Sequence, residues 1–261
     1  MRVVMCPPRH FAIDYRINPW MTPGTPVSTA TAVHQWQTIV DRYLDFGWDV
    51  RHVEPVPGLP DMVFAANAGF VLDVRVLLAR FAYAERRGEE AAYRSWFEAN
   101  GYRVTQTARA NEGQGDLMLV GEQILAGHGF RTDPAALAEV AGWSGREVVG
   151  LRLIDPRFYH LDTALASLGD GNIMWFPGAF DEAAQRVLKR RFPDGIVADE
   201  ADAVTFGLNA ISDGRHVVLA AGATWLCERL AAAGYLPVPI DTSELQLSGG
   251  SVKCCTLELG L

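Results

Sequence analysis

The stretch FAANAGFVLDVRVLLARF (64–81) decides the fold, because its pattern predicts one β-strand, a short turn and a second strand that leads toward a helix. Three further stretches have the same order: GDLMLVGEQILAGHGF (115–130), ALASLGDGNIMWFPGAF (164–180) and NAISDGRHVVLAAGA (209–223). A chain with this recurrence repeats one small supersecondary unit along its length.

Helical stretches between these hairpins end in a small or turn residue and lead into a β-rich run. The runs are FGWDVRHVEPV (46–56), NGYRVTQT (100–107), AGYLPVPI (233–240) and, less cleanly, SGREVVGLRLI (144–154) and PDGIVADEA (193–201). Successive units lie roughly 40–50 residues apart, a spacing that is typical of repeat architectures. The sequence therefore predicts about five similar units.

Two helices are predicted from apolar residues spaced three and four apart, which is the period of an amphipathic helix. One covers Val27 to Phe46, and the other covers Asp181 to Phe192, where the aspartate has the character of an N-cap. The apolar stripe of the first helix consists of Val33, Trp36, Ile39, Val40, Tyr43 and Leu44.

Five strand–turn–strand–helix–strand units can close into a ring around a central axis. We therefore predict an α/β fold, a five-bladed α/β propeller of ββαβ repeats, as a single domain over residues 1–261. No Ser/Gly-rich linker or charge run marks a domain boundary. The loops of a closed ring converge at one end, which suits one central active site.

The composition is that of an ordinary globular protein, with 49% hydrophobic and 21% charged residues. A net charge of −8 argues against nucleic acid or an anionic membrane as a partner. No apolar stretch approaches the length that spans a bilayer, and the four cysteines form no CxxC pair. We expect a cytoplasmic protein without structural disulfides and, because its histidines and cysteines are scattered, without zinc.

Cys254 lies in the stretch GSVKCCTLELG (250–260), behind two glycines and beside Lys253. We interpret this run as a strand near the end of the chain, with the thiol at its mouth. A nearby positive charge favours the thiolate, which is the nucleophilic form of cysteine. Cys255 should point to the opposite face of such a strand and serve as a small buried hydrophobic residue.

Further chemically capable side chains occur in four stretches that should form converging loops. These are PDMVFAANAG (60–69) with Asp61 and Asn67, NEGQGD (111–116) with Glu112 and Asp116, HGFRTD (128–133) with Arg131 exposed in a turn, and FYHLDT (158–163) with His160 and Asp162. On a strand, residues two apart face the same way, so His160 and Asp162 are expected to line one surface. Each residue alone is more often a turn former, a cap or a satisfied core residue. Together with a cysteine they form a nucleophile, base and binding set.

These motifs resemble the guanidine-modifying superfamily of five-bladed α/β propellers, the penteins. That superfamily includes arginine deiminases, dimethylarginine dimethylaminohydrolases, arginine dihydrolases and amidinotransferases. The resemblance extends from INPWM (17–21) to GGSVKC (249–254), and it rests on the ordered set PDxxxxxN, EGxGD, RTD, HxD and GGxxxC.

The resemblance implies a hydrolase without cofactor or metal, acting on the guanidinium carbon of arginine or a guanidino derivative through a covalent cysteine intermediate. It implies the following roles: Cys254 as nucleophile, His160 as general acid and base, Glu112 beside them, Arg86 and Arg131 at the substrate carboxylate, Asp61 at the amino-acid end, and Asn67 and Asp162 at the guanidinium. A cationic substrate would itself lower the pKa of the thiol and make it nucleophilic.

Three residues bear on the subclass. In the resembled enzymes, the position of Asp162 is more typically Lys in dimethylarginine hydrolases, whereas Asn67, rather than Asp, is typical of arginine dihydrolases, as is Asn18 in INPWM. The leading hypothesis is an arginine dihydrolase, which converts arginine to ornithine, carbon dioxide and two ammonia molecules. Arginine deimination to citrulline, dimethylarginine hydrolysis and a non-catalytic arginine sensor are the alternatives.

The oligomeric state is open in the sequence, and a homo-oligomer is one of the expected possibilities. Trp143, Trp175 and Trp225 are candidate interface residues, and the Pro- and Thr-rich stretch Pro19–Pro26 is a candidate lid.

Overall fold

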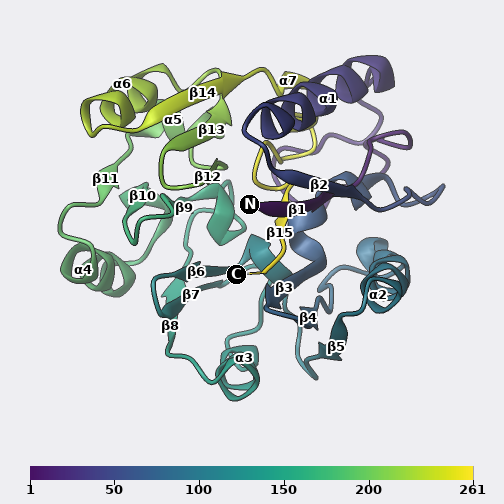
Figure 1. Ribbon diagram of the computed structural model, residues 1–261, viewed down its shortest axis with the longest axis horizontal. Helices are drawn as coiled ribbons and strands as arrows, with labels where there is room; N and C mark the ends of the chain where they lie inside the picture. Colours follow the sequence, from purple (N-terminus) through teal and green to yellow (C-terminus); the bar gives the residue numbers. More distant parts are fainter. Residues whose placement is uncertain (261) are drawn as a thin grey trace.

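Small three-stranded sheets surround a central axis in the computed structural model, which describes residues 1–260 (Figure 1). Within that range, fifteen strands form five sheets. From the axis outward, the sheets are β15 (Leu257–Glu258), β1 (Arg2–Met5) and β2 (Asp49–His52); β3 (Gly69–Leu72), β4 (Arg75–Leu78) and β5 (Arg103–Gln106); β6 (Leu117–Val120), β7 (Gln123–His128) and β8 (Val148–Arg152); β9 (Leu165–Ser167), β10 (Ile173–Trp175) and β11 (Ile196–Val197); β12 (Ile211–Ser212), β13 (His216–Ala220) and β14 (Leu236–Ile240).

Every sheet has the same internal order. The inner strand pairs antiparallel with the middle strand, and the middle strand pairs parallel with the outer strand. A parallel pair needs a crossover, and a helix on the outside of the ring supplies it in each blade (Figure 1). The crossover helices are α1 (Thr29–Asp45), α2 (Glu89–Ala99), α3 (Ala136–Ser144), α4 (Glu182–Arg191) and α6 (Thr224–Ala232). The predicted five-bladed propeller of ββαβ repeats is confirmed.

Short helices complete the described chain. They are α5 (Glu200–Val204) and α7 (Ser243–Gln246), with the 3₁₀ turns η1 (Pro60–Val63), η2 (Ala65–Ala68), η3 (Ala84–Arg86), η4 (Gly113–Gly115), η5 (Leu161–Thr163) and η6 (Pro177–Ala179). The single domain over 1–261 stays a prediction, and its last residue lies outside the described range.

One blade is shared between the two ends of the chain. Its inner strand β15 comes from the end of the sequence, whereas β1, α1 and β2 come from the beginning. Val3 is opposite Glu258 and Val4 is opposite Leu257 in this antiparallel pair. Both chain ends therefore lie near the centre of the ring (Figure 1).

Local signals explain where the two predicted helices begin. The Ser28 side chain accepts the Thr31 N–H at the start of α1, and the Asp181 side chain accepts the Ala184 N–H at the start of α4. The stripe of α1 is buried at Trp36, Ile39, Val40 and Tyr43, as expected. The observed burial differs from the prediction at the two ends of the stripe, where Val33 is half-buried and Leu44 is exposed.

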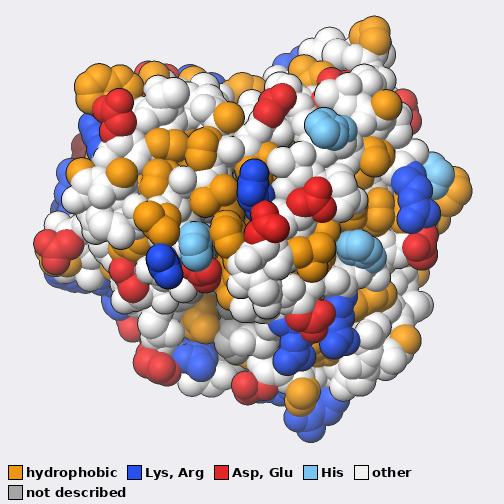
Figure 2. Space-filling view, turned by 45° about the horizontal axis from the view of Figure 1, so that its top comes forward, with side chains coloured by type: hydrophobic (Ala, Val, Ile, Leu, Met, Phe, Trp, Pro, Cys, Tyr) orange, Lys and Arg blue, Asp and Glu red, His pale blue; other side chains and the backbone are white. Residues whose placement is uncertain are grey.

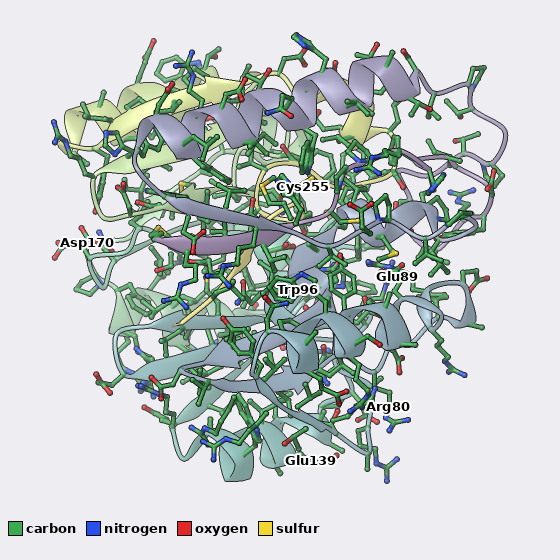
Figure 3. The ribbon with its side chains drawn as sticks, turned by 45° about the vertical axis from the view of Figure 1, so that its right-hand side comes forward. Arg80, Glu89, Trp96, Glu139, Asp170 and Cys255 are labelled. Carbon is green, nitrogen blue, oxygen red and sulfur yellow. The ribbon has the colours of Figure 1, made fainter. Side chains whose placement is uncertain are left out.

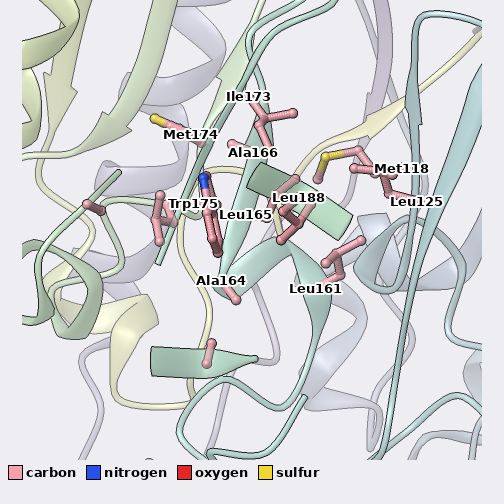
Figure 4. Packing of buried hydrophobic residues seen from close by; sticks show 14 of the residues in the cluster. Met118, Leu125, Leu161, Ala164, Leu165, Ala166, Ile173, Met174, Trp175 and Leu188 are labelled. Carbon is pink, nitrogen blue, oxygen red and sulfur yellow. The ribbon is translucent and has the colours of Figure 1, made fainter. Parts of the chain in front are cut away.

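The largest apolar cluster fills the blades built from β6 to β14 (Figure 4). Trp175 lies in it and is 1% exposed, so it cannot serve as an interface residue. Trp143 packs under the guanidinium of Arg75, whose Cζ lies 5.1 Å from its ring centroid. Trp225 is 60% exposed, so its place at a subunit interface stays a prediction.

The surface mixes charges of both signs, without a single-sign patch on the face drawn in Figure 2. Across residues 1–260 no helix is both long and apolar enough to cross a membrane. The cytoplasmic location stays a prediction.

The blades meet at the axis through close backbone packing. Gly113 has a φ of 53°, and a methyl group placed on its Cα would lie 2.5 Å from Gly69 N, 2.6 Å from Gly69 O and 2.8 Å from Asn67 O. These contacts are backbone atoms of the neighbouring blade and have no room to move. Gly121 has a similar φ of 60°, but nothing lies within 4 Å of the same position.

Gly113→Ala should therefore destabilise the ring far more than Gly121→Ala. Both variants force alanine into the left-handed region, at about 1–2 kcal/mol. Gly113→Ala adds the cost of an overpacked interior, about 1–3 kcal/mol more. Denaturant unfolding of the two variants measures the difference, and equal losses of stability would contradict the close packing of the blades.

Candidate active site

The segments that precede the inner strands converge at one end of the axis. The 3₁₀ turns η2, η4 and η5 lie in these segments, and η4 contacts both of the others. The chemically capable residues in these segments are Asn67 before β3, Glu112 before β6, His160 and Asp162 before β9, Asn209 before β12 and Cys254 before β15. Each is 0–2% exposed. The ring thus brings together residues that lie far apart in the sequence.

His160 and Glu112 form a buried pair. His160 Nε2 lies 2.7 Å from Glu112 Oε2, and because a carboxylate only accepts, Nε2 carries the proton. The other ring nitrogen, Nδ1, is buried and has no partner among residues 1–260. His160 is an extended residue directly before η5, so its predicted position on a strand with Asp162 is wrong. A 3₁₀ turn, instead of a pleat, sets the spacing of these two side chains.

Glu112 is held as a carboxylate. Its Oε2 accepts a second bond from Arg131 Nη1 at 3.0 Å, and its Oε1 accepts the Ala82 N–H at 3.1 Å. Burial disfavours the charge, but Arg131, the bond from His160 and the more distant Arg86 outweigh it and hold the pKa of Glu112 well below its usual range.

Arg131 is 4% exposed, so its predicted exposure in a turn is wrong. Its guanidinium lies between the rings of Tyr83 and Tyr159, with Cζ 4.6 and 4.7 Å from their centroids. Besides Glu112, it donates to the Ile17 carbonyl at 2.9 Å through Nη2. Stacking and burial suit the planar guanidinium, and its remaining N–H groups are available to an anion.

Arg86 lies behind Asn67 and is almost fully committed. Its Nε and Nη2 donate to the two oxygens of Glu89 at 2.8 Å, and Nη2 also donates to the Asp61 carbonyl at 3.2 Å. Its Nη1 donates to Asn67 Oδ1 at 2.7 Å, which leaves one Nη1 hydrogen without an acceptor.

Glu89, the partner of Arg86, begins α2 (Figure 3) and is fully buried. Burial raises the pKa of Glu89 to about 7, although the charge of Arg86 acts in the opposite direction. The role of Arg86 at a substrate carboxylate stays a prediction.

The Arg86 bond fixes the orientation of the Asn67 amide. Since a guanidinium only donates, the Asn67 oxygen must face Arg86, and its NH₂ group must face the site. Asn67 Nδ2 is buried without a partner. A methyl group at Gly115 would lie 2.3 Å from Asn67 Nδ2 and 3.3 Å from His160 Nδ1, so glycine is needed where these two atoms approach.

Asp162 and Cys254 form the other half of the site. Cys254 Sγ donates to Asp162 Oδ2 at 3.3 Å, and Asp162 Oδ1 has no partner in the described chain. Burial raises the pKa of Asp162 to about 7, although the bond from Cys254, Lys253, Asn209 and Arg86 oppose the shift. Burial and the neighbouring Asp162 raise the pKa of Cys254 well above its usual value. In the free protein, the sulfur is therefore a thiol.

Three of the six buried side-chain nitrogen and oxygen atoms that lack a partner within residues 1–260 belong to this site. They are Asn67 Nδ2, His160 Nδ1 and Asp162 Oδ1. A native protein leaves few such atoms, and their gathering beside a thiol marks the place where a polar ligand completes the bonding.

Cys254 lies in a turn over residues 252–255, and β15 begins at Leu257, so the thiol lies at the mouth of a strand as expected, but the two cysteines themselves are in a turn instead of on the strand. Cys255 is fully buried, as predicted, in the apolar cluster beneath α1 (Figure 3). The Lys253 ammonium bonds Gln114 Oε1 and Glu258 Oε2, both at 2.8 Å, and it lines a cavity of ≈ 600 Å³ at the hairpin end of the axis. The hydrogen bonds of the Lys253 ammonium therefore go to Gln114, Glu258 and the Thr256 carbonyl, not to the sulfur.

Asn209 is the residue that sequence reasoning missed. Its Nδ2 lies 3.0 Å from Cys254 Sγ, and its Oδ1 accepts the Cys254 N–H at 3.0 Å. It lies two residues before β12, as Asn67 lies two residues before β3. This repeated asparagine is the signal in the sequence that would have identified it.

Asp116 supports the site from behind. Its carboxylate accepts the Thr132 hydroxyl at 2.7 Å and the Leu161 N–H at 3.0 Å, so it joins the segments that hold Arg131 and His160. Burial raises the pKa of Asp116 to about 6.

The segment Tyr15–Met21 covers the entrance. Tyr15 donates to Asp61 Oδ2 at 2.8 Å, Asn18 Nδ2 donates to the Ser248 carbonyl at 3.0 Å, and Asn18 Oδ1 accepts two backbone N–H groups. A cavity of ≈ 320 Å³ opens to the surface between this segment, Arg131 and Tyr159. Within the candidate lid Pro19–Pro26, Trp20 and Met21 are packed, whereas residues 22–26 are mostly exposed, and its role as a lid stays a prediction.

A search of residues 1–260 finds no group of three or more His, Cys, Asp or Glu side chains that could hold a metal ion. The site instead gathers acceptors, an amide and a thiol, which are groups that suit a polar organic ligand.

Comparison with known proteins supplies the family. The family described as N,N dimethylarginine dimethylhydrolase, eukaryotic, matches residues 18–212. An N(G),N(G)-dimethylarginine dimethylaminohydrolase of Mycobacterium tuberculosis is 53% identical over 99% of this chain and 85% of its own length. The bifunctional arginine dihydrolase/ornithine cyclodeaminase ArgZ of Synechocystis is 40% identical over 99% of this chain, which spans 38% of the length of ArgZ.

The fold agrees with that family. The N-terminal domain of ArgZ, in a cysteine-to-serine variant bound to substrate, superposes with a TM-score of 0.95 at 39% identity, covering 100% of this chain and 99% of that domain. These relatives are enzymes, which removes the sensor alternative. The chain is a hydrolase of guanidino C–N bonds, and it belongs to the dimethylarginine dimethylaminohydrolase family of the guanidine-modifying superfamily.

Proposed function

We propose that the substrate is free L-arginine and that the site hydrolyses it twice, to ornithine, carbon dioxide and two ammonia molecules. The observation that carries the proposal is the fixed orientation of Asn67, whose NH₂ group faces the site without a partner. An N–H donor is a poor neighbour for a guanidinium, which offers only N–H groups. It is a suitable neighbour for the oxygen of a ureido group, the product of a first hydrolysis.

Asp162 supplies the complementary group. Its unpartnered Oδ1 accepts an N–H from the substrate, and its charge pairs with the guanidinium. Asn67 and Asp162 together therefore provide one donor and one acceptor. That set fits arginine through Asp162 and the ureido intermediate through both residues.

In the proposed first cycle, the guanidinium cation favours the Cys254 thiolate, the thiol proton passes to His160 Nδ1, and the sulfur attacks the central carbon. His160 Nδ1 then gives that proton to the departing nitrogen, and ammonia leaves. Water then gives up a proton to His160 Nδ1 and attacks the S-bound carbon. The C–S bond breaks, the thiolate is restored and a ureido group remains.

In the proposed second cycle, Cys254 attacks the ureido carbon while Asn67 Nδ2 donates to its oxygen. A second ammonia departs, and water converts the S-bound carbonyl to a carbamate of ornithine, which loses carbon dioxide. The sum is arginine plus two waters to ornithine, carbon dioxide and two ammonia molecules. Arg131 is proposed to hold the substrate carboxylate at the entrance and Asp61 to lie near its amino group.

Dimethylarginine hydrolysis is the second candidate, because the relative at 53% identity is named for that activity. The arginine proposal is supported by ArgZ and by its substrate-bound N-terminal domain, described as an arginine dihydrolase. A single unpartnered carboxylate oxygen beside the thiol also favours a guanidinium nitrogen that still carries its hydrogens.

Product identification tests the proposal directly. The purified protein incubated with L-arginine should yield ornithine and two ammonia molecules per arginine. Asn67→Asp should stop at citrulline and one ammonia, because a carboxylate repels the ureido oxygen while still accepting from Arg86. Amino-acid chromatography with an ammonia assay measures both ratios.

Citrulline as the final wild-type product would replace the proposal with deimination. Turnover of dimethylarginine but not of arginine would establish the second candidate. A product ratio unchanged by Asn67→Asp would remove Asn67 from the second hydrolysis.

The two neighbouring cysteines provide a matched test of the nucleophile. Cys254→Ser should lower kcat by at least roughly 10³-fold, since it removes the proposed attacking atom. Cys255→Ser should keep kcat within about threefold and cost about 1–3 kcal/mol of stability, because it places a hydroxyl in an apolar cluster. Comparable losses of kcat in both variants would contradict the assignment.

The pKa of Asp162, raised to about 7, predicts a pH dependence of binding. Below pH 7 the free protein holds a proton on Asp162 that a guanidinium must displace, so KM for arginine should rise as the pH falls, by up to roughly tenfold per pH unit. Asp162→Asn should raise KM at pH 8 and abolish this slope. Initial rates between pH 5.5 and 8.5 measure it, and an equal slope in both proteins would assign the effect elsewhere.

A further inference from the structure

The Asn209 side chain clamps the turn that holds Cys254. Its Oδ1 accepts the N–H groups of Ser251 and Cys254, both at 3.0 Å, and its backbone carbonyl accepts the Lys253 N–H at 3.1 Å. Its Nδ2 donates to the Asp162 carbonyl and lies 3.0 Å from Cys254 Sγ. One fully buried amide therefore joins the turn, the sulfur and the η5 segment.

The orientation of this amide is not ambiguous. Backbone N–H groups only donate, so the oxygen must face Ser251 and Cys254, and the NH₂ group must face the sulfur. Over residues 1–260, Asn209 Nδ2 is the side-chain N–H donor that the structure places within hydrogen-bonding distance of Cys254 Sγ, and the backbone N–H of Ser251 also lowers the pKa of the thiol. Asp162 Oδ2 is the acceptor at the same atom.

Asp162 and Asn209 favour opposite protonation states of the Cys254 sulfur. Asp162 Oδ2 accepts from the S–H of a thiol and repels a thiolate. Asn209 Nδ2–H makes a weak bond to a neutral thiol and a stronger, charge-assisted bond to a thiolate. When the thiol ionises and a guanidinium occupies Asp162, the bond from Asn209 remains and strengthens.

We propose that Asn209 is a catalytic residue of this site, whose Nδ2–H stabilises the Cys254 thiolate while its Oδ1 holds the turn that aims the sulfur. This inference rests on Cys254 as the proposed nucleophile. It gives Asn209 the task that the sequence had suggested for Lys253, whose ammonium is paired with Glu258.

The segment before Asn209 is built for accurate placement. Phe206 adopts a φ of 60°, which a bulky residue rarely does, and the Asn209 N–H donates to its carbonyl at 3.0 Å. The Trp20 ring of the covering segment packs on the Phe206 ring with centroids 4.8 Å apart. The cover over the entrance is thereby in contact with the loop that positions the amide.

The charged and titratable groups around the sulfur are Asp162, Cys255 and Tyr159. None of them donates a hydrogen bond to the sulfur, and a negative charge on any of them disfavours the thiolate. Removing the Asn209 donor should therefore move the ionisation of Cys254 to higher pH.

Asn209→Asp tests the proposal, because it keeps an acceptor for the two backbone N–H groups and removes the donor. Alkylation of Cys254 by iodoacetamide, followed on the Cys254 peptide by mass spectrometry from pH 6 to 10, reports the thiolate in each protein. We expect the pH midpoint to rise by at least about one unit. We also expect kcat with arginine to fall roughly 10²-fold, as for loss of one preorganised donor, with KM within about threefold.

Asn172→Asp is the matched control. The Asn172 amide also bridges backbone groups, since it donates to the Asp194 carbonyl and accepts the Ile173 N–H, but it lies in the β9–β10 turn. Its alkylation midpoint and kcat should equal those of the wild type. An Asn209→Asp protein that loses thermal stability but keeps the wild-type midpoint would overturn the proposal and leave Asn209 a structural role.

A measurement on the unmodified protein covers the case in which Asn209→Asp does not fold. The ¹⁵N–¹H signals of the Asn209 side chain should shift with pH at the midpoint of Cys254 alkylation, and they should lose that shift in Cys254→Ser. Signals that do not respond would overturn the proposal. A Cys254→Ser protein that still turns over arginine would instead refute the nucleophile itself, whatever Asn209 does.

Discussion

The antiparallel pairing of β15 with β1 is the interaction on which the rest of the structure depends. It joins Val3 to Glu258 and Val4 to Leu257, and it completes the blade that the two chain ends share. Because Cys254 lies three residues before β15, the same pairing carries the thiol to the axis. Ring closure and placement of the proposed nucleophile are therefore one event, and a contact between residues more than 250 positions apart governs both.

The site consists of buried charged and polar groups that bond to one another but leave three of their atoms without a hydrogen-bond partner. Glu112 is matched by Arg131 and Glu89 by Arg86, both pairs almost fully buried. Such pairs contribute little net stability, but breaking one strands a charge in the interior, so they rigidify the groups that they orient. What remains unmatched is Asp162 Oδ1, Asn67 Nδ2 and His160 Nδ1. A planar cation with N–H donors supplies what Asp162 Oδ1 and His160 Nδ1 lack, whereas Asn67 Nδ2 needs an acceptor, such as the oxygen of the proposed ureido intermediate.

The two asparagines show how one residue type serves different ends at equivalent places in two blades. Asn67 is oriented by Arg86 so that its NH₂ group faces the site. Asn209 is oriented by the turn of residues 251–254 so that its NH₂ group faces the sulfur. In both cases the hydrogen-bond partner of the amide oxygen determines the direction in which the NH₂ group points. The identity of the residue does not reveal that direction.

Local patterns in the sequence determined the five-unit propeller, both amphipathic helices and the motifs that hold Asn67, Glu112, His160, Asp162 and Cys254. Periodicity and turn chemistry act over a few residues and are legible without a structure. Only the tertiary structure decided the burial of Arg131, the pairing of Lys253 with Glu258, the 3₁₀ turn under His160 and the bonds of Asn209. Each of these depends on groups brought together by ring closure, and a hydrogen bond between distant segments leaves no periodic trace in the chain.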